Sequence, residues 1–120
     1  MNSTDDDLSP HRPVMLDEVI SFINPSKGDI IVDATIGAAG HSCEILKKIQ
    51  PDGLLIGIDK DAEILKIASR FLSKISDSYK LYQADFVNLG CVLEKLKISK
   101  VNGILLDLGV SSLQLDSLDR

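Results

Sequence analysis

Apolar and polar positions follow two alternating patterns along the chain. Short and nearly continuous apolar runs cover residues 30–34, 54–58 and 103–108, with a weaker run over 79–83. Between these runs, apolar residues recur at spacings of three and four over residues 42–49, 61–72 and 88–96. Continuous runs are typical of strands covered on both faces, and the three–four spacing is typical of amphipathic helices. The pattern therefore predicts strand–helix units in series.

Strand–helix units in series form right-handed crossovers and a parallel sheet. A shorter amphipathic helix over residues 17–23 precedes the series, and we expect Asp61 and Asn88 to cap two of the later helices. The predicted fold is α/β, with four parallel strands in the order 3-2-1-4 and flanking helices. Strand four is expected to expose an unpaired edge. In such a sheet a ligand crevice opens at the carboxyl ends of strands one and four.

Composition narrows the class of protein without identifying a site. The 120 residues, 44% hydrophobic and 26% charged, suit one domain or part of one. We expect residues 1–10, which are polar and acidic, to be a disordered tail, and residues 11–120 to form the domain. The tail lacks the features of a signal peptide, and no apolar run approaches the ~18 residues that span a membrane.

Charge and cysteine content limit the partners. A net charge of −5 has the wrong sign for a segment that grips phosphates by itself. We therefore expect no DNA partner, and we expect any RNA-binding basic surface to lie outside this segment. Cys43 and Cys91 have no metal-ligand spacing, so we expect reduced thiols in a cytoplasmic protein and no metal site.

A glycine-bearing turn follows the first strand. It has the form Asp33-x-x-x-Gly37-x-x-Gly40, which lacks the middle glycine of a dinucleotide fingerprint and the lysine of a P-loop. An acid beside a small-residue turn suits S-adenosyl-L-methionine, which carries an ammonium and a sulfonium but no pyrophosphate. The alternatives are a tight turn without a ligand and the turn of an NAD-binding oxidoreductase.

Three further residues are candidates for the same ligand. Asp59 ends the second strand, where an acid accepts hydrogen bonds from ribose hydroxyls in both NAD and S-adenosyl-L-methionine sites. Phe86 follows the third strand and either packs on an adenine ring or belongs to the core. His41 opens the first helix of the series, as a cap or as a residue facing the ligand.

Asp107 ends the fourth strand and is the candidate catalytic residue. A carboxylate that accepts the N–H of an exocyclic base amine raises its nucleophilicity and takes its proton as charge develops. The alternative is a carboxylate that serves the cofactor or a helix N-terminus.

Four segments together resemble one family. They are residues 11–19, 32–42, 56–61 and 103–116, the last reading Gly-Ile-Leu-Leu-Asp-Leu-Gly-Val-Ser-Ser-Leu-Gln-Leu-Asp. They are similar to the bacterial ribosomal RNA small subunit methyltransferase H family, also called MraW. The resemblance implies a Rossmann-like class I methyltransferase sheet that uses S-adenosyl-L-methionine to methylate the exocyclic N4 amine of a cytidine in 16S-type rRNA. It implies cofactor contacts at Ala39, Gly40, His41, Asp59, Phe86, Asp107 and Gln114.

The sequence departs from the family pattern in three ways. Leu113 stands in place of a usual proline, and we expect this change to loosen the loop that holds Gln114. Ala38 and Ala39 stand where the family is richer in glycine, and we expect their methyl groups to crowd the cofactor. The chain ends at Arg120, where the family continues into further strands and a helical region implied to engage rRNA. We therefore expect a truncated sheet that supplies the cofactor-binding half, reaches the small ribosomal subunit through other regions, and is inactive alone. A non-catalytic cofactor-binding remnant is the alternative.

Overall fold

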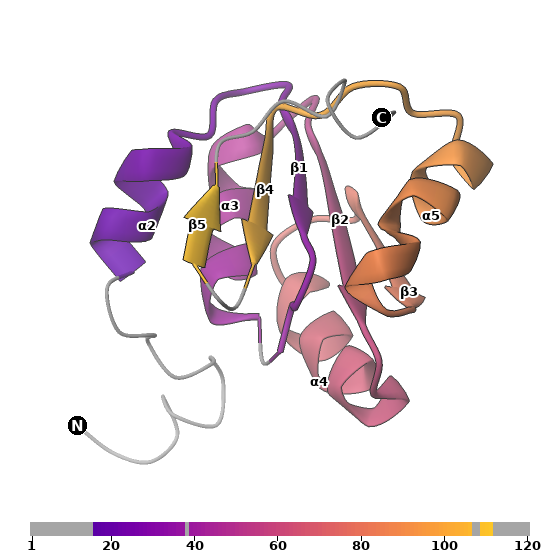
Figure 1. Ribbon diagram of the computed structural model, residues 1–120. Helices are drawn as coiled ribbons and strands as arrows, with labels where there is room; N and C mark the ends of the chain where they lie inside the picture. Colours follow the sequence, from indigo (N-terminus) through magenta and orange to yellow (C-terminus); the bar gives the residue numbers. More distant parts are fainter. Residues whose placement is uncertain (1–15, 38, 107–108, 112–120) are drawn as a thin grey trace, which may run out of the picture.

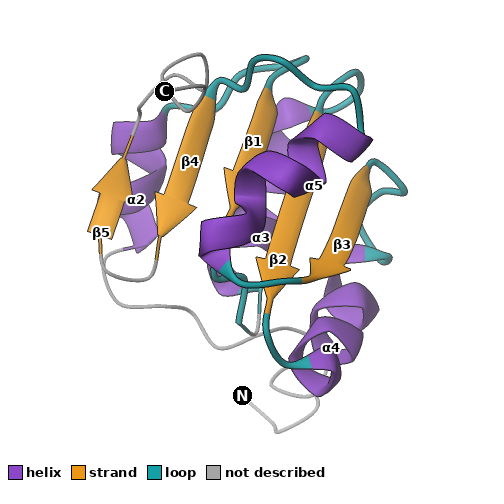
Figure 2. Cartoon of the chain, turned by 45° about the vertical axis from the view of Figure 1, so that its right-hand side comes forward, coloured by secondary structure: helices purple, strands orange, loops and turns teal. Residues whose placement is uncertain are grey.

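The computed structural model describes residues 16–37, 39–106 and 109–111, in which a five-stranded sheet has helices on both faces (Figures 1 and 2). The strands are β1 (Ile30–Asp33), β2 (Leu54–Asp59), β3 (Tyr79–Gln83), β4 (Gly103–Leu106) and β5 (Gly109–Ser111). The helices are α2 (Leu16–Ile23), α3 (Gly40–Ile49), α4 (Ala62–Leu72), the 3-10 turn η1 (Phe86–Asn88) and α5 (Leu89–Lys95).

The strand order is β3-β2-β1-β4-β5, and the first four strands of this row are parallel. The predicted order 3-2-1-4 is therefore confirmed. β1 lies in the middle, with Val32 opposite Ile56 of β2 and opposite Ile104 of β4. Its carboxyl end consequently has a neighbouring strand end on each side.

The prediction of an unpaired edge on strand four is wrong. β5 runs antiparallel to β4, with Ile104 opposite Ser111 and Leu106 opposite Gly109. Only positions 107 and 108 separate the two strands, so the entropic cost of bringing them together is small. The pairing satisfies backbone groups of β4 that would otherwise face water.

Local capping explains where two helices begin. Asp61 caps α4 as predicted, since its Oδ1 accepts the backbone N–H of Glu63 at 2.8 Å. Asn88 is the N-cap residue of α5, as predicted, but its side chain makes no capping hydrogen bond. Asp85 takes the role one turn earlier and accepts the N–H of Val87 at 3.2 Å, so a 3-10 turn leads into α5.

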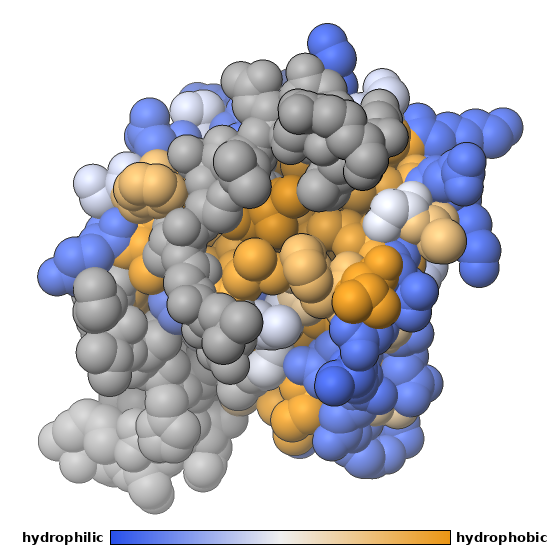
Figure 3. Space-filling view, in the orientation of Figure 1, coloured by the Kyte–Doolittle hydropathy of each residue, from blue (hydrophilic) through white to orange (hydrophobic). Residues whose placement is uncertain are grey.

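Two apolar clusters cover the two faces of the sheet. Helices α2, α3 and α4 bury one face, whereas α5 lies on the other (Figure 2). Neighbouring strand residues point to opposite faces, so Ile31 belongs to the first cluster and Val32 to the second. Figure 3 shows apolar residues gathered on the α5 face and bordered by polar ones. This packing holds the strand ends at the carboxyl edge in fixed positions.

Candidate functional site

Three of the sequence-predicted residues lie in a row at the carboxyl edge of the sheet. Asp33 ends β1, Asp59 ends the adjacent β2, and Phe86 opens η1 just beyond the end of β3. A backbone hydrogen bond joins the end of β2 to the segment just after β3, since the N–H of Ala84 donates to the carbonyl of Asp59 at 3.0 Å. An elongated ligand lying along this edge can contact Asp59 and Phe86, whereas Asp33 is buried beneath it.

The turn after β1 is anchored to both neighbouring strands. The N–H of Ala34 donates to the carbonyl of Leu105 in β4 at 2.8 Å. Two residues later, the N–H of Ile36 donates to the carbonyl of Ile58 in β2 at 3.1 Å, and the Ile36 side chain is buried. The turn therefore has one defined shape before any ligand arrives, which lowers the entropic cost of binding.

Asp59 links the turn to the start of α4. Its Oδ2 accepts the N–H of Gly37 at 3.3 Å and its Oδ1 accepts the N–H of Asp61 at 2.9 Å. Gly37 has a φ of 54°, a conformation that glycine adopts without steric cost. A carboxylate has about four lone-pair positions, so Asp59 retains acceptor capacity for hydroxyl groups of a ligand.

The N-terminus of α3 opens onto the same edge. Ala39 is the N-cap residue and provides no side-chain cap. The N–H groups of the first helical turn therefore need acceptors from outside the helix, and a helix N-terminus favours negative charge. Gly40 and His41 begin this turn and are both partly exposed. The position suits a carboxylate of a ligand.

The structure places Ala39, whose methyl group we expect to crowd the cofactor, in the core. Ala39 is fully buried and belongs to the apolar cluster beneath α2 and α3. Its φ of 72° places this residue in the left-handed region and turns Cβ toward the core. Ala38, the other alanine of this pair, lies outside the described residues.

Asp33 supports the turn from below. It is only 2% exposed, and its Oδ2 accepts the hydroxyl of Ser42 at 2.6 Å while its Oδ1 accepts the N–H of Thr35 at 3.3 Å. Ser42 is itself completely buried. The pair ties the turn to the first turn of α3. Ser42 was missed by the sequence reasoning, although a hydroxyl residue in the helix that follows an acid–glycine turn is a usable signal.

The far end of the edge combines an aromatic ring with a charged pair. Phe86 is 40% exposed, so part of its ring surface is open to a planar group. The ammonium of Lys60 lies 3.8 Å from Oδ2 of Asp85, which precedes Phe86. These side chains give the edge both stacking surface and polar groups next to Asp59.

Two predicted residues, Asp107 and Gln114, lie outside the described residues. Within the described part of the chain, no group of His, Cys, Asp and Glu side chains has the arrangement of a metal site. None of the helices in the described ranges is long and apolar enough to cross a membrane. Burial raises the pKa of the Cys43 thiol to about 11, so this thiol stays protonated and is a poor nucleophile.

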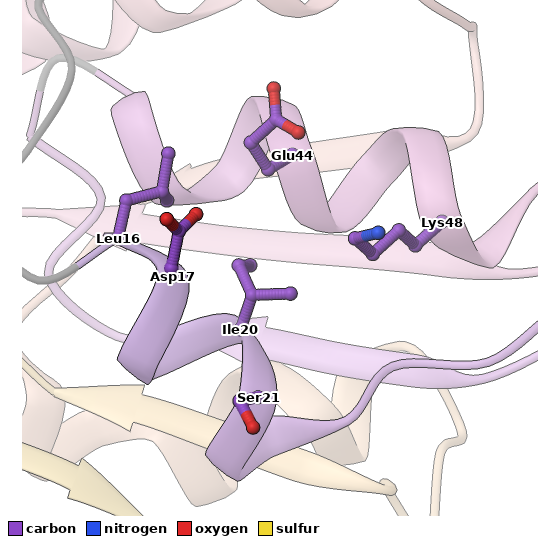
Figure 4. Close-up of a pocket in the computed structure, with 6 residues that line it drawn as sticks. All are labelled: Leu16, Asp17, Ile20, Ser21, Glu44 and Lys48. Carbon is purple, nitrogen blue, oxygen red and sulfur yellow. The ribbon is translucent and has the colours of Figure 1, made fainter.

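A groove of about 250 Å³ lies between α2 and α3 (Figure 4). Asp17 and Ile20 extend from α2 toward α3, and the side chain of Lys48 lies along α3. The remaining lining residues are Leu16, Ser21 and Glu44. The sequence pattern did not predict this groove, because it arises from the side-by-side packing of two helices.

Comparison with protein families identifies relatives over nearly the whole chain. The family model described as the MraW methylase family matches residues 8–120. Ribosomal RNA small subunit methyltransferase H from Mycoplasma mobile is 49% identical over 110 residues, covering 92% of this chain and 36% of the relative. The protein of the same name from Dictyoglomus thermophilum is 48% identical over 112 residues, covering 93% and 38%. The chain thus spans little more than a third of the length of these relatives.

Comparison with solved structures supports the fold. A SAM-dependent O-methyltransferase from Thermotoga maritima matches with a TM-score of 0.64 at 18% identity, over 78% of this chain and 34% of that chain. A putative rRNA methylase from Clostridium thermocellum matches with a TM-score of 0.62 at 19% identity, over 95% and 57%. The described sheet is therefore a Rossmann-like methyltransferase sheet.

Proposed function

Because this chain belongs to the MraW methylase family, we propose that it is the cofactor-binding part of an rRNA methyltransferase. The cofactor is S-adenosyl-L-methionine, and the acceptor is the exocyclic N4 amine of a cytidine in small-subunit rRNA. The protein acts in the cytoplasm, where it meets the small ribosomal subunit. The observation that carries the proposal is the row formed by the α3 N-terminus, Asp59 and Phe86 along one edge.

This row matches the chemical order of the cofactor. The methionine carboxylate binds the N–H groups at the start of α3, near Gly37, Ala39, Gly40 and His41. The ribose hydroxyls donate to Asp59, whose carboxylate is held by two backbone N–H groups. The adenine ring stacks on the exposed part of Phe86.

Asp33 serves the cofactor through the shape of the turn, since its carboxylate is buried against Ser42. Asp107 and Gln114 are proposed to complete the cofactor site beyond β4. A direct role of Asp107 in catalysis, accepting the N–H of the cytidine amine, is a secondary proposal. The target cytidine must be unpaired or flipped out to reach the methyl group.

Ligand-induced thermal stabilisation tests the cofactor assignment. S-adenosylhomocysteine, the cofactor product, should raise the melting temperature of the chain, whereas NAD should not. At a ligand concentration of 100 Kd, binding adds about 2.7 kcal/mol to stability. Asp59→Ala should weaken S-adenosylhomocysteine binding by roughly tenfold or more, the equivalent of about 1.4 kcal/mol.

Asp77→Asn is the matched control for this experiment. Asp77 is an exposed acid in the loop before β3, at the opposite edge of the sheet, so its removal should leave the affinity unchanged. Stabilisation by NAD without stabilisation by S-adenosylhomocysteine would overturn the methyltransferase assignment. We expect no transfer of methyl groups from labelled cofactor to small subunits by this chain alone, and detected transfer would contradict its expected inactivity.

A further inference from the structure

Charged side chains are divided unequally between the two edges of the sheet. The carboxyl edge and the first turn of α4 carry acids, namely Asp33, Asp59, Asp61, Glu63 and Asp85. Two lysines near them are already paired: Lys60 lies 3.8 Å from Asp85 and Lys66 lies 3.2 Å from Glu63. This edge suits a cationic cofactor.

The opposite, amino edge has lysines in two adjoining loops. Lys27 lies in the turn before β1, and Lys97 and Lys100 lie in the loop between α5 and β4. The second loop is bonded to the start of β1, where the first loop ends, because the N–H of Asn102 donates to the carbonyl of Ile30, the first residue of β1, at 2.7 Å. In return, the N–H of Ile30 donates to Oδ1 of Asn102 at 2.8 Å. Figures 1 and 2 show both loops along the same edge of the sheet.

These three lysines are exposed, and none takes part in an ion pair of the described residues. Other lysines have a structural role, since Lys95 lies in the last turn of α5 and complements the helix dipole there. Lys27 and Lys100 lie outside any helix, so this explanation does not apply to them, whereas Lys97 lies just beyond the C-cap of α5. The two loops that carry these lysines hold one acid, Asp29, which accepts the N–H of Ser26, and Glu94 lies in the last turn of α5. Asp52 and Asp77 lie in the other loops of this edge, before β2 and β3.

Lys97 occupies a backbone position that normally belongs to glycine. Its φ is 60°, and it follows α5 in a Schellman arrangement. Its N–H donates to the carbonyl of Glu94 at 3.0 Å, and the N–H of Ile98 donates to the carbonyl of Leu93 at 2.9 Å. A lysine here is strained relative to glycine, and strain of this kind concentrates at functional positions. We therefore attribute the presence of lysine rather than glycine at position 97 to its ammonium group.

We propose that Lys27, Lys97 and Lys100 form a phosphate-binding edge that holds the backbone of the RNA substrate. The identity of the polyanion as RNA rests on the proposed function, whereas the surface itself follows from the placement of the lysines. The net charge of −5 averages an acidic cofactor edge with this basic edge. The expectation that every RNA-binding surface lies outside this segment followed from that average.

Salt-dependent RNA binding tests the proposal. The chain is titrated, without cofactor, into a fluorescently labelled hairpin from small-subunit rRNA at increasing KCl, and anisotropy is recorded. Each lysine–phosphate contact contributes about 0.7 to 0.9 to the slope of log K against log salt, so three contacts give roughly −2 to −3. Lys27→Gln and Lys100→Gln should each reduce the slope by about one contact. Lys66→Gln, which removes an ammonium already paired with Glu63, should change neither slope nor affinity.

Lys97→Gly separates binding from folding. Glycine relieves the left-handed strain, so the melting temperature should rise by a few degrees while RNA affinity and the salt slope fall. Lys97→Gln removes the charge without supplying glycine, and it should lower RNA affinity to the same extent. Unchanged affinity and slope in the triple variant of Lys27, Lys97 and Lys100 would overturn the proposal, as would absence of RNA binding by the wild-type chain in low salt.

The two proposals fail separately. RNA binding is measured without cofactor, so Asp59→Ala should lose S-adenosylhomocysteine binding and retain the wild-type RNA affinity. A chain that binds RNA through the three lysines but binds no S-adenosylhomocysteine supports this edge and contradicts the proposed function. A chain that binds S-adenosylhomocysteine, but whose RNA affinity does not depend on the three lysines, supports the proposed function and contradicts this edge.

Discussion

The hydrogen bond between Ser42 and Asp33 shows how one buried residue controls the shape of the site. A carboxylate that is 2% exposed requires donors, and the hydroxyl of Ser42 supplies one at 2.6 Å. The bond connects the end of β1 to the first turn of α3, on either side of the turn that the cofactor is proposed to contact. The pair therefore stabilises the site without reaching its surface.

Ser42→Ala should destabilise the chain by about 1–3 kcal/mol, because a buried carboxylate loses a hydrogen-bond donor. The free energy of unfolding in urea measures this loss, and S-adenosylhomocysteine affinity should fall with it as the turn loosens. Ser73→Ala is the control, since its exposed hydroxyl donates to the carbonyl of Arg70 at 3.2 Å and should matter by at most about 0.5 kcal/mol. Equal losses in the two variants would argue against a special role of the Asp33 pair.

Cys43 should make stability depend on alkaline pH. Burial raises the pKa of its thiol from 9.0 to about 11. The unfolded chain releases this proton first, so the stability gained from a neutral thiol is complete below pH 9.0 and is lost as pH rises toward 11. Urea unfolding from about pH 8 to 10.5 should show a steeper decline for the wild type than for Cys43→Ala. Parallel curves would show that the buried thiol does not contribute.

At the scale of elements, two glycines determine how closely α3, β2 and the turn pack. A Cβ on Gly53 would lie 2.5 Å from the Ile49 carbonyl and 2.7 Å from that of Asp29, and neither backbone atom can move aside. A Cβ on Gly57 would lie 2.5 Å from Cδ1 of Ile36 and 2.8 Å from Cδ2 of Leu81, which are flexible side-chain ends. The surroundings of Gly53 therefore cannot make room for an added methyl group, whereas the side chains around Gly57 can shift.

Gly53→Ala should therefore destabilise the chain by about 3 kcal/mol or more, and Gly57→Ala by about 1–3 kcal/mol. Because Ile36 anchors the cofactor turn, Gly57→Ala should also lower S-adenosylhomocysteine affinity. Gly90→Ala is the control: this helical glycine has no neighbour within 4 Å of an added Cβ, and alanine there should be stabilising. Chemical unfolding of the three variants measures the stability losses, and calorimetric titration measures S-adenosylhomocysteine affinity. A larger loss of stability in Gly57→Ala than in Gly53→Ala would contradict the predicted order.

For the whole molecule, the parallel sheet could be predicted from the sequence, but the antiparallel strand β5 and the cap at Asp85 could not. Alternating strands and helices leave few arrangements once crossovers must be right-handed, so the order through β4 was predictable. The pairing of β5 was not, because three residues after a strand have no distinctive pattern. The cap at Asp85 was not predictable either, because it belongs to a short 3-10 turn between β3 and α5.

The candidate site divides in the same way. Asp59 and Gly37 were predictable because one ends a strand and the other lies in the turn that follows a strand, where parallel sheets present their ligand contacts. The direction of the Ala39 side chain was not, since it follows from a left-handed φ. Ser42 was missed because its role requires that α3 begin at Gly40, two residues closer to β1 than the apolar spacing suggested.

The anchoring of the turn to both neighbours of β1 also determines when the site forms during synthesis. β1 and β2 are close in the chain, but β4 is distant: Ile30 and the Asn102 that bonds to it are separated by 72 residues. A ribosome releases the amino-terminal strands first, and contacts this far apart in sequence form late and slowly. The nascent chain therefore carries an unfinished turn, with Ala34 lacking its acceptor, until Leu105 has left the exit tunnel.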